Sequence, residues 1–177
     1  MIIVKAKEKD LPQIMDIVNE AKAYLKSKGI NQWQNGYPTA EILQEDIDRH
    51  HGYIAFDDAG QAVGIISAIF GGERQYDSII GEWLTNSMSH EPRYCAIHRV
   101  AVAKHASGQG VGHFLMTSIE DLARAQQAES LRIDTHLGNI PMRRLIEKCG
   151  YTECGIVHVL DRHETTRERI AYEKLIL

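Results

Sequence analysis

The sequence predicts an α+β fold, and three observations support this class. Segments in which apolar and polar residues alternate, as in strands, recur along the whole chain. Segments with apolar residues at helical spacing lie between them, and glycine or proline marks most boundaries. The 177 residues contain no repeat, linker or low-complexity tract. We therefore expect a single domain that spans residues 1–177.

The first part of the chain predicts three strands and two helices. A short strand is expected at residues 2–6, followed by a helix at 10–29 with Asp at its N-cap position and Pro in its first turn. A second helix, capped by a threonine, is expected at 39–47. Residues 53–56 and 63–70 predict two strands joined by the turn D-D-A-G. An irregular stretch follows, in which Glu73, Asp77 and Glu82 are each typical of solvated charges but together favour a cationic ligand.

The second part of the chain predicts four strands and two helices. A strand at 95–103 leads into a glycine-rich turn and a helix at 110–127. The next strand, 131–136, is followed by a helix at 139–148 that begins with an asparagine cap and a proline in its first turn. The last two predicted strands are 153–160 and 169–176.

Composition argues against several classes of protein. The net charge of −4 lacks the basic excess of a dedicated nucleic-acid binder. Three cysteines, Cys95, Cys149 and Cys154, follow no metal-ligand spacing, and neither do the nine histidines, so no metal site is expected. No apolar run approaches the ~20 residues of a membrane span, and the amino terminus lacks a signal-peptide pattern. These features predict a cytoplasmic protein with reduced thiols.

One segment, residues 95–112, predicts a phosphate-binding turn. It reads C-A-I-H-R-V-A-V-A-K-H-A-S-G-Q-G-V-G, a strand followed by three closely spaced glycines and a helix start. Unpaired amides at a helix start, with the positive end of the helix dipole, bind phosphate groups. Gly112 is followed by His113 and Phe114 rather than by Lys and Ser or Thr, which excludes a Walker loop. A dinucleotide fingerprint would need glycine at His113.

Two motifs make the chain resemble the GNAT superfamily of N-acetyltransferases. The first is V-A-V followed after five residues by G-Q-G-V-G, in which Ser107 stands where the family usually has Gln or Arg. The second is L-R-I-D-T-H-L-G-N-I-P-M-R-R-L-I-E-K-C-G-Y, which matches in register from Asn139 to Tyr151. Ile146 replaces the tyrosine that in many members protonates the leaving thiolate. The order of elements also agrees along nearly the whole chain.

The resemblance implies a fold, a co-substrate and the residues that bind it. The implied GNAT (acyl-CoA N-acyltransferase) fold is an αβα-layered α+β domain, with a mixed, mostly antiparallel sheet of about seven strands flanked by about four helices. The implied co-substrate is acetyl-CoA, without a metal. The residues expected to bind it are Val100, Ala101, Val102, Ser107, Gly108, Gln109, Gly110, Val111, Gly112, His113, Asn139 and Arg143.

The implied reaction is direct attack of a primary amine on the thioester, which requires a base for the amine proton. His98 is the preferred base, because imidazole titrates near neutral pH and several family members place a base at this position. Glu82 and His136 are the other candidates. Trp33, Tyr37 and Glu82 are expected to bind the acceptor, although the two aromatic side chains equally fit a role in the core.

Two interpretations of function remain open at this point. The first is an enzyme that acetylates the amine of a small molecule, amino acid derivative or peptide. The second is a catalytically weak CoA-binding sensor or partner protein, which the replacements at Ser107 and Ile146 favour. Neither interpretation involves nucleic acid or a membrane, and both allow a homodimer.

Overall fold

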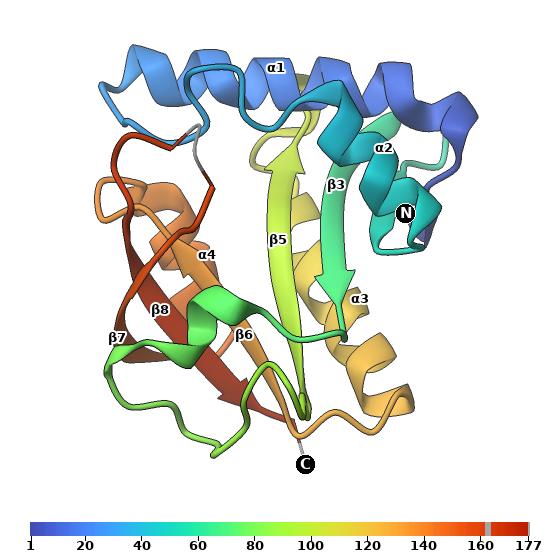
Figure 1. The fold of residues 1–177 in the computed structure, drawn as a ribbon. Helices are drawn as coiled ribbons and strands as arrows, with labels where there is room; N and C mark the ends of the chain where they lie inside the picture. Colours follow the sequence, from blue (N-terminus) through green and yellow to red (C-terminus); the bar gives the residue numbers. More distant parts are fainter. Residues whose placement is uncertain (162–163, 177) are drawn as a thin grey trace.

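The computed structural model describes residues 1–161 and 164–176, and these form an α+β fold with one central sheet (Figure 1). Its strands are β1 (Ile2–Lys5), β2 (Gly52–Phe56), β3 (Ala62–Ile69), β4 (Ile80–Gly81), β5 (Tyr94–Val102), β6 (Ser130–Thr135), β7 (Thr152–His158) and β8 (Glu168–Leu175). Its helices are α1 (Leu11–Ser27), α2 (Ala40–Asp48), α3 (Val111–Ala125) and α4 (Ile140–Lys148). The predicted fold class is confirmed, with eight strands in the described part of the chain rather than about seven.

The sheet has a single parallel junction. Its strand order is β1-β2-β3-β5-β6-β8-β7-β4, and every neighbouring pair is antiparallel except β5 and β6. These two strands pair from Tyr94 opposite Ser130 to Ile97 opposite Ile133. Beyond that point both strands continue, but they diverge toward α1 (Figure 1). The sheet therefore splits between β5 and β6.

Helices cover both faces of the sheet. α2 and the segment between β3 and β5 lie on the near face in Figure 1, and α3 lies behind the sheet. The main core joins the helices to the strands, with Val18 of α1 and Leu115 of α3 fully buried. A smaller cluster centred on Tyr76 packs under the segment between β3 and β5. No helix in the described ranges combines the length and apolar character that a membrane crossing requires.

The N-caps predicted for α2 and α4 form, whereas the one predicted for α1 does not. Thr39 Oγ1 accepts a hydrogen bond from the Ile42 amide at 3.3 Å, and Asn139 Oδ1 accepts one from Met142 at 3.4 Å. Both predicted caps are therefore confirmed. Asp10 precedes α1 but does not cap it with its side chain. Its carboxylate instead accepts from the Lys7 amide at 2.9 Å, in a short 3₁₀ turn before the helix.

Candidate active site

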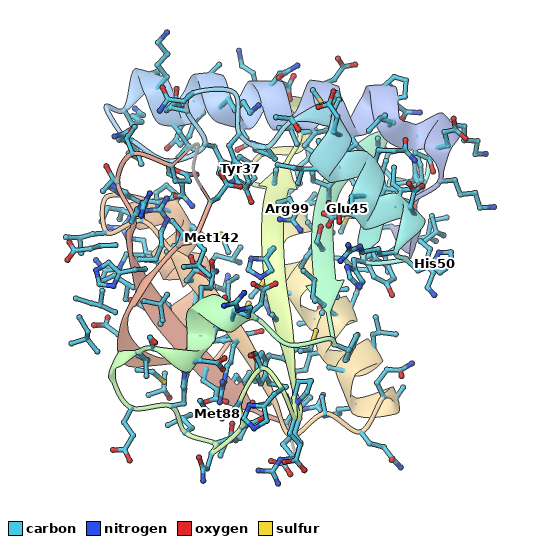
Figure 2. All side chains as sticks on the ribbon, viewed as in Figure 1. Tyr37, Glu45, His50, Met88, Arg99 and Met142 are labelled. Atoms are coloured by element: carbon cyan, nitrogen blue, oxygen red, sulfur yellow. The ribbon has the colours of Figure 1, made fainter. Side chains whose placement is uncertain are left out.

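A cleft of about 970 Å³ opens where β5 and β6 part. Residues 97–102 of β5 and 133–135 of β6 line it, together with parts of α1, the α1–α2 loop and α4. Figure 2 shows Tyr37, Arg99 and Met142 around the space between the diverging strands, and all three line the cleft. Because the split exposes strand edges, an extended ligand in the cleft can pair with main-chain groups.

The residues expected to bind the co-substrate divide into three groups. Val100, Ala101, Val102, Ser107 and Asn139 line the cleft. Residues 108–113 are not in the cleft wall among the described residues, but they follow Ser107 directly at the start of α3. Arg143 is outside the cleft wall as well.

The start of α3 has the geometry of an anion cradle. Gly108 and Gly110 adopt φ angles of +76° and +81°, and a Cβ at either position would meet no atom within 4 Å. The Phe114 amide donates to the Gly110 carbonyl at 3.0 Å, so the amides just before it belong to the orphan donors of a helix start. The Gln109 amide is already engaged by the Ala106 carbonyl at 3.3 Å. Gly112 serves packing, because a Cβ there would lie 2.8 Å from Leu145.

His98 and Glu73 lie together at the base of the split. His98 directly follows Ile97, the last residue of β5 that pairs with β6, and its Nε2 lies 3.4 Å from Glu73 Oε1. The imidazole stacks on Tyr76 with ring centroids 6.1 Å apart. Burial alone would raise the pKa of Glu73, but contacts with His98 and Arg99 outweigh burial and hold this pKa below its ordinary value. Glu73 therefore stays ionised beside the imidazole, and the buried Nε2 of His98 has no hydrogen-bond partner within the described part of the chain.

Asp134 places a second carboxylate beside His98, and the sequence patterns did not single it out. It directly follows Ile133, the last residue of β6 that pairs with β5, and lines the cleft. Its Oδ2 accepts hydrogen bonds from the Tyr76 hydroxyl at 2.8 Å and from Gln75 Nε2 at 3.2 Å. Burial raises the pKa of Asp134 above its ordinary value, although His98 and the Tyr76 hydrogen bond act in the opposite sense. Two carboxylates with opposite pKa shifts thus flank one imidazole.

The two aromatic residues of the α1–α2 loop reach the cleft. Trp33 is 9% exposed and belongs to the core, and its amide donates to Glu164 Oε1 at 3.0 Å. The Tyr37 hydroxyl accepts a hydrogen bond from Arg99 Nη1 at 3.2 Å. Both residues line the cleft and therefore combine packing with a place in the candidate site.

The other two candidate bases lie elsewhere. Glu82 is exposed beside β4, and its amide donates to the Cys154 carbonyl at 3.0 Å, at the far edge of the sheet from β1. The structure does not bring it to the cleft. His136 follows β6 but is not in the cleft wall among the described residues, and its Nδ1 accepts from the Gly138 amide at 3.0 Å. Burial lowers the pKa of His136.

Two further side chains named by the sequence motifs face away from the cleft. Arg143 Nε donates to the Tyr172 hydroxyl at 2.9 Å, and its Nη2 lies 3.5 Å from Glu153 Oε2. Ile146 is fully buried in the core. Cys95 is also fully buried, and burial raises the pKa of its thiol to about 12, which keeps it protonated.

The geometry agrees with comparisons to known proteins. The model of the Acetyltransferase (GNAT) family matches residues 12–151. A streptothricin acetyltransferase of Escherichia coli is 28% identical over 104 residues, which are 59% of this chain and 56% of that protein. The chain therefore matches just over half of the length of this curated relative.

Two solved structures extend the similarity to nearly the whole chain. A GNAT-family acetyltransferase from Streptococcus agalactiae 2603 has 29% sequence identity and a TM-score of 0.83, with 98% of this chain and 94% of that chain covered. A protein from Staphylococcus aureus MU50 has 25% identity and a TM-score of 0.72, with both chains covered in full. Because the family model matches more than half of the residues, and the split sheet and glycine-rich helix start lie within the match, this chain belongs to the GNAT acetyltransferase family.

Proposed function

We propose that this protein is an N-acetyltransferase that transfers the acetyl group of acetyl-CoA to the primary amine of a small molecule, amino acid derivative or peptide. The observation that carries this proposal is the His98–Glu73 pair, which lies where the sheet splits and faces one continuous cleft. Family membership supports acetyl-CoA as the co-substrate.

The chain's residues fit acetyl-CoA. The open space over Gly108 and Gly110 and the orphan amides at the start of α3 suit a diphosphate. Main-chain groups of Val100 and Val102 lie along the cleft, where they can bind the amides of the pantetheine arm as an added strand would. When bound, acetyl-CoA supplies an acetyl group activated as a thioester.

His98 then serves as the general base. An alkyl amine is mostly protonated at neutral pH and must lose a proton before it attacks. In this assignment Nδ1 of His98 accepts that proton, and Glu73 stabilises the resulting imidazolium through Nε2. A main-chain amide of β5 near Val100 stabilises the charge that develops on the carbonyl oxygen. His98 and Val100 belong to β5, Glu73 belongs to the segment between β3 and β5, and all three residues line the cleft.

Asp134 favours a cationic acceptor. Its Oδ2 is occupied by Tyr76 and Gln75, while the residue as a whole is partly exposed and lines the cleft. A carboxylate in such a position attracts an ammonium group and orients it toward His98. Trp33 and Tyr37 add aromatic surface to the wall of the same cleft.

The leaving thiolate needs no tyrosine in this assignment. Ile146 is fully buried, so the usual position of the acid is closed to the cleft. A free thiol has a pKa of about 8.5, which makes its thiolate a tolerable leaving group without a proton donor.

The test is turnover with a panel of amines. The protein is incubated with acetyl-CoA and with amino acids, peptides, polyamines and aminoglycosides, and free thiol and acetylated product are measured. We expect product with at least one cationic amine. Tight binding of acetyl-CoA without turnover of any amine would instead support the second candidate, a CoA-binding sensor. The observation that favours the sensor is the buried Ile146 in place of the usual tyrosine. Failure to bind acetyl-CoA would overturn both functions.

A further inference from the structure

Arg99 holds a strained backbone conformation inside a central strand. The register between β3 and β5 shifts between Ile65 and Ser67, which marks a bulge in the β5 segment opposite them. Arg99 lies in this bulge with φ of +53°, in the left-handed region that favours glycine. A non-glycine residue persists there only when its surroundings impose the conformation. The side chain of Arg99 shows what imposes it.

The guanidinium is held by a dense set of polar contacts. Nε donates to Asp46 Oδ2 at 2.5 Å and Nη2 donates to Asp46 Oδ1 at 2.7 Å, a bidentate pair. Nη1 donates to the Tyr37 hydroxyl at 3.2 Å, and Ser67 Oγ donates to Asp46 Oδ2 at 2.7 Å. The side chains of Arg99 and Asp46 are only 10% and 9% exposed. The bulge is thus fastened to α2, to β3 and to the α1–α2 loop.

These contacts lie next to the reacting groups. Arg99 stands between His98 and Val100 in sequence, so a change in its backbone angles moves the proposed base and the proposed oxyanion amide together. Its side chain lines the main cleft and also a second cavity of about 350 Å³ beside α2. Tyr37, whose hydroxyl is hydrogen-bonded to Arg99, lines both the main cleft and the second cavity.

A buried ion pair is in general only weak evidence of a gain in stability. A buried pair loses hydration, and apolar residues of similar volume often stabilise a fold as well or better. A bidentate guanidinium–carboxylate pair instead fixes direction and distance.

We infer that the Asp46–Arg99 pair is a positioning device, which holds the β5 bulge and Tyr37 in the arrangement that acetyl transfer needs. This inference rests on the proposed function for its catalytic consequence. It assigns Asp46 and Arg99 no contact with the reacting atoms.

The test replaces Asp46, Ser67 and Arg99 by apolar residues of similar size. The triple variant Asp46→Leu, Ser67→Ala and Arg99→Met removes both charges and the Ser67 hydroxyl together, so neither charge stays buried without its partner. The half-buried Tyr37 hydroxyl loses the Arg99 donor. We expect the melting temperature of this variant to stay close to that of the wild type and its affinity for acetyl-CoA to change little. We expect kcat with the best amine of the panel to fall by about 100-fold, the scale of a small misplacement of reacting groups. Amide exchange in residues 99–102 should become faster.

A matched control removes an ion pair outside the cleft. Lys174 Nζ lies 2.6 Å from Glu120 Oε2, between β8 and α3, and neither residue is in the described wall of either cavity. Glu120→Gln with Lys174→Met should leave kcat and amide exchange at 99–102 unchanged.

Two results would overturn the inference. One is a folded triple variant with wild-type kcat and wild-type exchange at the bulge. If the triple variant does not fold, Arg99→Lys serves in its place, because lysine keeps the positive charge but cannot form the bidentate pair with Asp46. Unchanged kcat and unchanged amide exchange at 99–102 in Arg99→Lys would equally contradict the inference. If the wild type transfers no acetyl group, the proposed function fails by itself, and amide exchange at 99–102 in the variants still decides whether the pair holds the bulge.

Discussion

At the scale of single residues, His98 offers the most direct test of the proposed proton transfer. We expect His98→Gln to fold, because glutamine keeps much of the volume and can direct its amide toward Glu73. It cannot titrate, so kcat/KM for the acceptor should fall by roughly 10²–10⁴-fold, the usual size of general-base assistance. Steady-state kinetics with the best amine of the panel measure this loss.

The pH profile separates catalysis from structure. In the wild type, kcat/KM should depend on pH through the general base and, separately, through the ionisation of the amine itself. The variant should keep only the dependence on the amine, with its melting temperature and acetyl-CoA affinity preserved. A His98→Gln protein that is less stable but retains both dependences would show that His98 is structural.

The free energy of unfolding should depend on pH through the protonation of Asp134. Because burial raises its pKa, the folded state binds this proton more tightly than the unfolded state. The resulting stabilisation is present below the unfolded pKa and is lost as the pH rises through the raised folded pKa. Asp134→Asn, which still accepts from Tyr76, should therefore raise the melting temperature at pH 7, and the gain should shrink in acid.

The same substitution should weaken acceptor binding. Removing the carboxylate should raise KM for a cationic amine and leave KM for acetyl-CoA nearly unchanged. A lower melting temperature at neutral pH, or an equal effect on both KM values, would contradict the role given to Asp134.

The sequence could identify only part of this residue constellation. His98, Trp33 and Tyr37 were expected in the site and do line the cleft, and their catalytic and binding roles stay predictions. Asp134 looked like one polar position of an alternating strand, and its importance depends on where the β5–β6 pairing ends. Glu82 belongs to the same acidic stretch as Glu73, but the chain between them crosses the sheet and carries Glu82 to the far edge.

At the scale of elements, the start of α3 can be tested with a residue that tolerates the same backbone. Asparagine adopts positive φ more readily than other non-glycine residues. Gly110→Asn should therefore fold, while its side chain fills the open space above the helix start. We expect calorimetry to show at least a tenfold loss of acetyl-CoA affinity, or about 1.4 kcal/mol.

Gly60 supplies the matched control. It has a φ of +78° and equally open space, but it lies in the turn between β2 and β3. Gly60→Asn should cost similar stability and leave acetyl-CoA affinity unchanged. Equal affinity of the two variants would mean that the diphosphate binds elsewhere.

Most elements were predictable because their local patterns agree with the final sheet. The seven expected strands and four expected helices all form, with ends that differ by a few residues. β4 was not predicted, because its two residues carry no periodicity. It forms where Gly81 and Gly155 allow close approach of two backbones, since a Cβ on Gly81 would lie 2.2 Å from the Cys154 carbonyl. The bulge at Arg99 likewise depends on contacts with α2 that are distant in sequence.

At the scale of the whole molecule, a buried ionic network joins β6 and β8 to the segment between β3 and β5. Arg132 Nε donates to Glu173 Oε1 at 2.9 Å, and both side chains are fully buried. The guanidinium carbon lies 4.3 Å from the Trp83 ring centroid and 4.2 Å from that of Tyr94. Further bonds from Arg132 reach the Thr85 and Ser87 carbonyls. The network fastens the segment that carries Glu73 and Tyr76 to β6 and β8.

Breaking this network should cost far more than breaking a surface pair. Glu173→Gln leaves the Arg132 charge without its partner and should lower the free energy of unfolding by about 3–5 kcal/mol. Glu45→Gln removes the partner of Arg49 in an exposed pair on α2 and should cost less than about 1 kcal/mol. Denaturant titrations of both variants measure the difference. Similar losses in the two would show that the buried network does not hold the segment in place.

The single parallel junction also governs when the chain acquires a binding site during synthesis. β2 with β3, and β7 with β8, are neighbours along the chain, so each pair closes a short loop. β5 meets β6 only after α3 has been made, and such less local pairing forms more slowly. A nascent chain that has emerged only as far as β5 has one wall of the cleft and no second strand to diverge from it. We therefore expect the cleft to be complete only late in synthesis, once β6 and β8 have left the ribosome.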